Sequence, residues 1–112
     1  MYFAFKKPGG DWSIPDSVPN IPGYPWTNCI QFDNQGTLHY VWQEGRNGPY
    51  EIYYKSYRDG SWSAEENISN TSGESFAPDF AIGPGGLYVV WSEKGETDTS
   101  YNWEIYFDVV AP

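Results

Sequence analysis

Hydrophobic and polar residues alternate along short stretches of the chain, and turn-forming residues separate these stretches. Leu38, Tyr40 and Trp42 fall on one face of a strand over 37–43, and the residues between them fall on the other face. No segment repeats apolar residues at helical spacing for three turns. The pattern therefore predicts a protein built from many short strands, with no helix.

Four strands make up the clearest unit of this pattern. We name them A to D in chain order and predict them at about 28–33, 37–43, 50–56 and around 62. The turns between them, Asp33-Asn34-Gln35-Gly36 and Asp59-Gly60, contain residues that tolerate positive φ. The unit is thus predicted to be an antiparallel sheet whose neighbouring strands are joined by short turns.

The same unit occurs twice. Four anchors recur in the same order about 50 residues later: Asp11-Trp12-Ser13 as Ser61-Trp62-Ser63, Ile30 and Phe32 as Phe80 and Ile82, 36–42 as 86–91, and 51–54 as 104–107. Inner strands that are apolar on both faces are typical of a sheet covered on both sides, as in a propeller blade. A plain antiparallel sandwich is the alternative, but it does not require two units that match anchor for anchor.

The predicted fold is therefore all-β, with two four-stranded antiparallel propeller blades in a single two-blade unit over 1–112. The repeats lie at about 12–61 and 62–112, and the N-terminal strand 2–6 is expected to take part in blade closure. The strand order reads C, D, A, B, C, D, A, B, C, which leaves one C strand surplus. Two blades alone cannot close a ring. We therefore expect the ring to be completed either by a longer parent chain or by association of copies of this chain, with a trimer as the first choice and a tetramer as the second.

Several stretches resemble a known repeat. Phe-Ala-Pro-Asp-Phe-Ala-Ile (76–82), Gly-Gly-Leu-Tyr-Val-Val-Trp (85–91) and Trp-Glu-Ile-Tyr (103–106) are similar to the sialidase-like propellers, and 56–62 resembles their Asp-box (BNR) turn. The resemblance implies a propeller in which that turn is structural. Two-blade fucose lectins that close as trimers are similar in architecture, but their sugar-binding residues do not map onto this chain.

Catalysis is not expected. Sialidases hold a carboxylate with three arginines, and this chain has only Arg46 and Arg58. His39, the only histidine, occupies the position of Tyr88 in the second repeat and is interpreted as a packing residue. The acidic residues Glu93, Glu96 and Asp98 lack the regular spacing of calcium ligands, so we predict no metal and no cofactor.

Composition narrows the possible partners. Fifteen acidic residues against six basic ones give a net charge of −9, which disfavours a nucleic-acid partner. No segment approaches the length of a membrane span, and the apolar and basic parts of 1–7 stand in the reverse of signal-peptide order. We therefore expect a soluble chain without a membrane partner. Its location is not predicted. Cys29 is the only cysteine, so an internal disulfide is excluded. We interpret Cys29 as a small apolar residue that fills space in an inner strand.

The candidate binding residues gather in the D–A and B–C connections, which share one face of a propeller. They are Tyr24, Trp26, Glu44, Arg46, Phe76, Glu93, Tyr101 and Trp103. Aromatic rings beside charged hydrogen-bonding groups are typical of sites that bind sugar rings. Alternatively, the equivalent residues Trp26 and Phe76 fill the seam between the blades. We predict a non-catalytic module with a structural or protein-interaction role. A carbohydrate-binding propeller and a fragment of a propeller glycosidase are the alternatives.

Overall fold

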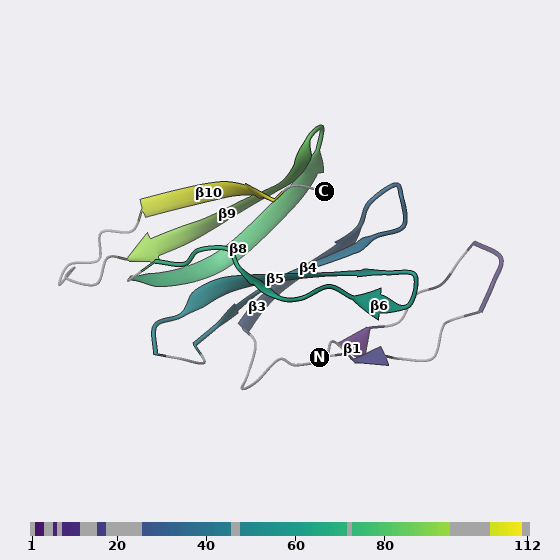
Figure 1. Cartoon of the computed structure of the whole chain (residues 1–112), viewed down its shortest axis with the longest axis horizontal. Helices are drawn as coiled ribbons and strands as arrows, with labels where there is room; N and C mark the ends of the chain where they lie inside the picture. The colour runs from purple at the N-terminus through teal and green to yellow at the C-terminus, as the bar shows by residue number, and fades with distance from the viewer. Residues whose placement is uncertain are drawn as a thin grey trace.

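The structure is a computed structural model, and it describes residues 2–3, 6, 8–11, 16–17, 26–45, 48–71, 73–94 and 104–110. This part of the chain contains strands, turns and bends but no helix, and every strand pairing is antiparallel, which confirms the all-β prediction (Figure 1). The strands are β1 (Tyr2–Phe3), β2 (Asp16–Ser17), β3 (Trp26–Phe32), β4 (Leu38–Glu44), β5 (Glu51–Arg58), β6 (Ser61–Trp62), β7 (Glu66–Asn67), β8 (Glu74–Gly83), β9 (Gly86–Lys94) and β10 (Glu104–Val110).

These strands form three sheets. The first sheet runs in the order β3-β4-β5-β6, with β7 paired to β5, and the second runs in the order β10-β9-β8. A small third sheet joins β1 to β2. Predicted strands A, B, C and D of the first unit thus correspond to β3, β4, β5 and β6.

The second sheet differs from the predicted four-stranded unit. It has three strands in the described part of the chain, which correspond to strands A, B and C. Trp62, which precedes this sheet along the chain, pairs with Tyr57 of β5, as predicted for strand D of the first unit. The tight turn at Asp59 and Gly60, both with positive φ, folds β6 back onto β5 and so assigns strand D to the first sheet.

Each of the two larger sheets has two chemically distinct faces. We call the face that carries Trp42 or Trp91 the tryptophan face of its sheet, and the other the opposite face. In the first sheet, the register pairs Trp42 with Tyr53 on the tryptophan face and Val41 with Tyr54 on the opposite face. All seven residues of β4 are buried, so this central strand is covered on both sides.

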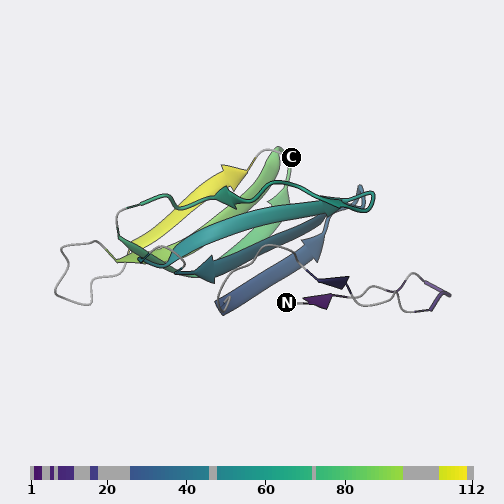
Figure 2. The same cartoon turned by 60° about the horizontal axis from the view of Figure 1, so that its bottom comes forward.

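The two sheets pack in a head-to-tail manner, with the second sheet lying over the first in both views (Figures 1 and 2). One core cluster joins the tryptophan face of the second sheet to the opposite face of the first, and it consists of Leu87, Val89 and Trp91 together with Val41, Ile52 and Tyr54. A second cluster lies on the tryptophan face of the first sheet and contains Tyr40, Trp42 and Tyr53, with Trp62 against it. The two faces that meet at the seam are therefore different surfaces of equivalent sheets.

Candidate functional site

The predicted binding residues fall partly outside and partly inside the described residues. Tyr24, Arg46, Tyr101 and Trp103 lie outside the described residues. The same holds for Glu96 and Asp98 of the acidic cluster, and of Trp26 only the backbone, at the start of β3, is described. Glu44, Glu93 and Phe76 are described with their side chains.

Glu93 is a buried hydrogen-bond acceptor. Only 5% of the residue is exposed. Its Oε2 accepts from the Trp91 indole Nε1 at 2.9 Å and from the Ser75 hydroxyl at 2.7 Å, and its Oε1 accepts from the Thr71 hydroxyl. A buried carboxylate needs such donors, because its desolvation would otherwise be costly. Through these hydrogen bonds the Glu93 carboxylate links Ser75 of β8 to Trp91 of β9 inside the core.

Glu44 repeats this arrangement in the first sheet. It is 2% exposed, and its Oε1 accepts from the Trp42 indole Nε1 at 3.2 Å. Residues two apart in a strand point to the same face, so a Trp-x-Glu sequence places the carboxylate beside the indole in both repeats. Glu44 and Glu93 are both buried inside the protein, and neither is placed to meet a ligand in solution.

Phe76 lies at one end of the seam between the sheets. Its ring is 5.4 Å from that of Tyr50, and the backbone N–H of the adjacent Ser75 donates to the Tyr50 carbonyl at 2.7 Å. Next to it, the Ala77 N–H donates to the Gln43 side chain at 2.8 Å. Phe76 and Tyr50 are both half-buried, so the pair packs the sheets together and still presents ring surface to solvent.

An irregularity of the backbone accompanies these aromatic positions in both repeats. The β3–β4 register shifts between Trp26 and Asn28, and the β8–β9 register shifts between Phe76 and Asp79. Ala77, inside the second shift, has a φ of 52°. Bulges re-aim the residues around them, so the repeat preserves a bend as well as a pattern of side chains.

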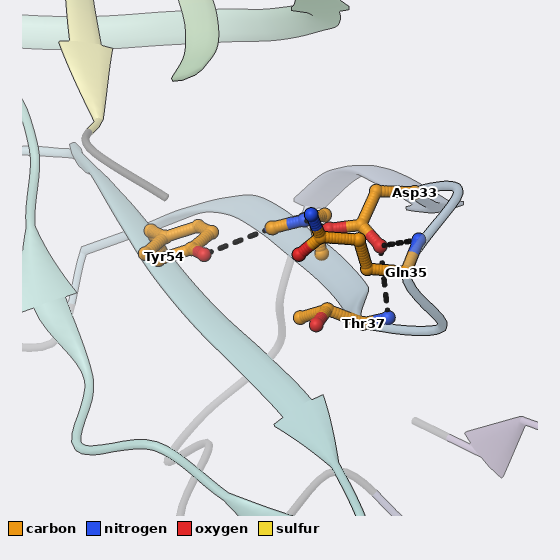
Figure 3. A network of polar contacts seen from close by, with 5 residues as sticks. Asp33, Gln35, Thr37 and Tyr54 are labelled. Atoms are coloured by element: carbon orange, nitrogen blue, oxygen red, sulfur yellow. Dashed lines mark hydrogen bonds and ion pairs between the residues drawn. The ribbon is translucent and has the colours of Figure 1, made fainter. Parts of the chain in front are cut away.

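The opposite end of the seam carries a chain of polar contacts, Asp33–His39–Tyr54. Figure 3 labels Asp33 and Tyr54 within this network. The His39 ring shares one hydrogen bond with Asp33 through Nε2 and another with the Tyr54 hydroxyl through Nδ1, each of 2.9 Å. Asp33 Oδ1 also accepts from the backbone N–H groups of Gln35 at 2.8 Å and Thr37 at 3.0 Å. His39 is therefore buried as expected of a packing residue, but it also ties the β3–β4 turn to β5.

The ionisation of this chain follows from its surroundings. Desolvation opposes ionisation of Asp33, but the hydrogen bonds from His39, Thr37 and Gln35 outweigh it and lower the pKa of Asp33 below its ordinary value. Burial raises the pKa of the Tyr54 phenol. Such a phenol stays protonated at neutral pH, so the Tyr54 hydroxyl serves here as a hydrogen-bond partner of His39.

A cavity of about 200 Å³ opens beside this chain, between the β3–β4 and β8–β9 turns. Its walls are Asp33, Asn34, Gln35, His39, Ile82, Gly83, Gly85, Gly86 and Leu87. This volume is below the range usual for small-molecule sites, which begins at roughly 300 Å³. Among the described residues, no group of three or more His, Cys, Asp or Glu side chains is placed to hold a metal ion.

Cys29 lies at the seam as a thiol. Its Sγ donates to the Pro78 carbonyl at 3.0 Å, and the residue packs against the core cluster shared by the two sheets. Burial, together with the nearby Asp79 carboxylate, raises the pKa of this thiol. A raised pKa keeps the thiol protonated at neutral pH and so unreactive.

Comparison of the chain with protein-family models, with curated proteins and with solved structures finds no match. Searching the described residues for a helix able to cross a membrane also finds none.

Acid should weaken the fold partly through Asp33. Because the folded-state pKa of Asp33 is depressed, its contribution to stability is complete above the unfolded value of about 3.9 and is lost as the pH falls through the folded value. We expect Asp33→Asn to lower the melting temperature at pH 5–7, and the gap from the parent to close near pH 2. Melting curves across this range would measure it. Asp59→Asn is the control for net charge, because the Asp59 side chain is 94% exposed; an equal gap for both variants would contradict the assignment.

Proposed function

We propose that the chain is a non-catalytic building block of a β-propeller, with a structural or protein-interaction role, and that copies of it join into a ring. The observation that carries this proposal is the head-to-tail seam between the two sheets. The tryptophan face of one sheet covers the opposite face of an equivalent sheet. A contact of this kind can be repeated, and it forms a closed ring when the rotation between successive sheets allows it.

The outer face of the second sheet supports a repeated contact. Val90 is 42% exposed and Tyr88 is 38% exposed on its opposite face. Their equivalents in the first sheet, Val41 and His39, are buried at the seam. The same positions are thus buried in one repeat and exposed in the other. Exposed apolar residues at such positions indicate a surface that contacts a partner.

The partner expected on that face is another copy of the chain. On the tryptophan face of the first sheet, Tyr40 and Trp42 are already buried within the chain, and the exposed apolar residues are Ile30 and Phe32 of β3, at 47% and 44%. Contact between the two outer faces would add one seam per chain. Three chains would give six sheets and four would give eight, and both numbers are within the range of known propellers.

The solution mass tests this proposal. Light scattering at micromolar concentration should report three or four times the chain mass of 12.8 kDa. Val90→Lys, which places a charge in the proposed contact, should reduce the particle to a single chain. Asn34→Lys adds the same charge to an exposed turn and should leave the mass unchanged. A stable parent monomer would contradict the proposal and favour a piece of a longer propeller, such as a glycosidase, whose further repeats cover the outer faces.

Carbohydrate binding is the second candidate function, and the half-buried Tyr50–Phe76 pair supports it. The two rings stand at the end of the seam where the β4–β5 connection meets the start of β8. Aromatic rings with one free side can stack on the C–H face of a sugar. Retention on immobilised mixed glycans that is lost in Phe76→Ala, but kept in Tyr88→Ala, would favour this function.

A further inference from the structure

The cavity beside the Asp33–His39–Tyr54 chain is lined by residues of both sheets. It has a volume of about 200 Å³. Four of its lining residues belong to the β3–β4 hairpin and five to the β8–β9 hairpin: Asp33, Asn34, Gln35 and His39, and Ile82, Gly83, Gly85, Gly86 and Leu87. Since all of them come from one chain, the cavity does not depend on the association of copies.

The cavity carries a negative charge at Asp33. Hydrogen bonds from His39, Thr37 and Gln35 hold the pKa of Asp33 below its ordinary value, so its carboxyl group is ionised at neutral pH. The Asp33 side chain is only 16% exposed, so water screens its charge less than that of a surface carboxylate. No lysine or arginine is among the described residues that line the cavity. The charge of Asp33 therefore favours a positively charged ligand.

Asp33 also has acceptor capacity left for such a ligand. Its Oδ1 accepts from the backbone N–H groups of Gln35 and Thr37 (Figure 3), and its Oδ2 shares one hydrogen bond with His39. An ionised carboxylate has about four acceptor positions, which leaves one on Oδ2. Next in the turn, the exposed side chains of Asn34 and Gln35 each carry a carbonyl oxygen. A primary ammonium group has three N–H donors, which match these three acceptors.

The β8–β9 side of the cavity is apolar or consists of main chain. Ile82 and Leu87 contribute apolar side chains, and three of the four residues over 83–86 are glycines. The volume is too small for a drug-sized ligand but is sufficient for a short carbon chain. Such a chain would be removed from water against Ile82 and Leu87, which favours its binding. The cavity thus combines a charged side with an apolar side.

We propose that this cavity is a binding site for a primary alkylammonium group. The nitrogen donates to Asp33 Oδ2 and to the side-chain carbonyl oxygens of Asn34 and Gln35. The carbon chain lies against Ile82 and Leu87. A small free amine and a lysine side chain of another protein both carry this group. The site is additional to the proposed ring contact, which uses the outer faces of the two sheets.

Titration with n-butylammonium chloride at pH 8, followed by NMR of the backbone amides, tests the site. The amides of Gln35, Thr37 and Gly85 should shift until they saturate, with a dissociation constant in the millimolar range, roughly what a ligand of five non-hydrogen atoms reaches. The amides of Ser75 and Ala77, at the other end of the seam, should not shift. n-Butanol and butyrate have a similar carbon chain but no positive charge, so they should bind at least fivefold more weakly.

Two variants locate the ligand within the cavity. Asp33→Asn removes the charge but keeps an oxygen that can accept the backbone N–H groups of the turn, and it should weaken the binding of n-butylammonium at least fivefold. Ile82→Phe places a larger side chain on the β8 side of the cavity and should weaken binding without changing the charge. Asp59→Asn is the control, because the Asp59 side chain is 94% exposed and does not line the cavity. Well-dispersed amide spectra would show that each variant is folded.

A lysine capped at both its amino and carboxyl groups distinguishes the two sources of the ligand. Equal affinity for capped lysine and n-butylammonium would assign a lysine side chain, and binding of n-butylammonium alone would assign a small free amine. Both results support the site. Shifts that n-butanol or calcium chloride reproduce, or that persist in Asp33→Asn and Ile82→Phe alike, would overturn it. Because light scattering measures the ring separately, loss of this site would leave the proposed assembly unaffected.

Discussion

Replacing Trp91 by alanine is expected to lower the free energy of unfolding by about 3–5 kcal/mol, the usual cost of truncating a large buried aromatic side chain. Trp91 is 4% exposed and belongs to the core cluster that joins the two sheets. Its loss would leave a void at the seam, and it would also remove the indole donor from the buried Glu93. Urea unfolding followed by circular dichroism would measure the change.

Trp42→Ala is the matched variant in the first sheet. Trp42 is fully buried and stacks with Tyr40 and Tyr53, with ring centroids 4.8 and 5.7 Å away. We expect a loss of the same size, whereas Trp62→Ala, at a half-buried position, should cost less. If both Trp91→Ala and Trp42→Ala melt within about two degrees of the parent, the packing of the sheets described above is wrong, since a 1 kcal/mol loss shifts the midpoint of a domain this size by roughly 4–8 °C.

The strands of the first sheet could be predicted well, because their signals are local. Alternation over 37–43 and the Asp33-Asn34-Gln35-Gly36 turn place β4 within one residue of its observed bounds, Leu38–Glu44. Burial of Trp42 and Trp91 also follows from apolar residues two positions before each of them. Short-range patterns of this kind need no knowledge of which distant strands meet.

Strand D of the first unit could be predicted from an equally local signal. The Asp59-Gly60 turn folds the chain back after strand C, so Trp62 is expected to pair with that strand. The observed pairing of Trp62 with Tyr57 depends on the tight turn at Asp59, whose φ is 50°. It leaves three strands for the second sheet in the described part of the chain.

The burial of Glu44 and Glu93 does not follow from their charge, because glutamate is rarely fully buried unless it is paired. The signal for burial was the Trp-x-Glu spacing in both repeats, which places an indole donor beside each carboxylate. Likewise, the partners of His39 lie six and fifteen residues away, and only the folded structure brings Asp33 and Tyr54 to it.

Glu93→Ala should cost about 3 kcal/mol of unfolding free energy, because it removes the acceptor shared by several donors at once. The Trp91 indole and the Ser75 hydroxyl are buried with it, and a buried donor left without a partner costs about 1–3 kcal/mol. Glu66→Ala, at an exposed position in β7, should change the stability by less than about 0.5 kcal/mol. Urea unfolding of both variants beside the parent would measure the difference.

Two further variants identify the cause of the loss. Ser75→Ala removes one donor and leaves the carboxylate its other partners, so it should cost only about 1 kcal/mol. Combining Glu93→Ala with Trp91→Ala should cost less than the sum of the two single changes by about 1–2 kcal/mol, because the first change removes a hydrogen bond that the second also removes. Strict additivity would mean that the indole and the carboxylate contribute independently. The repeated Trp-x-Glu pair would then stabilise the sheets by packing alone.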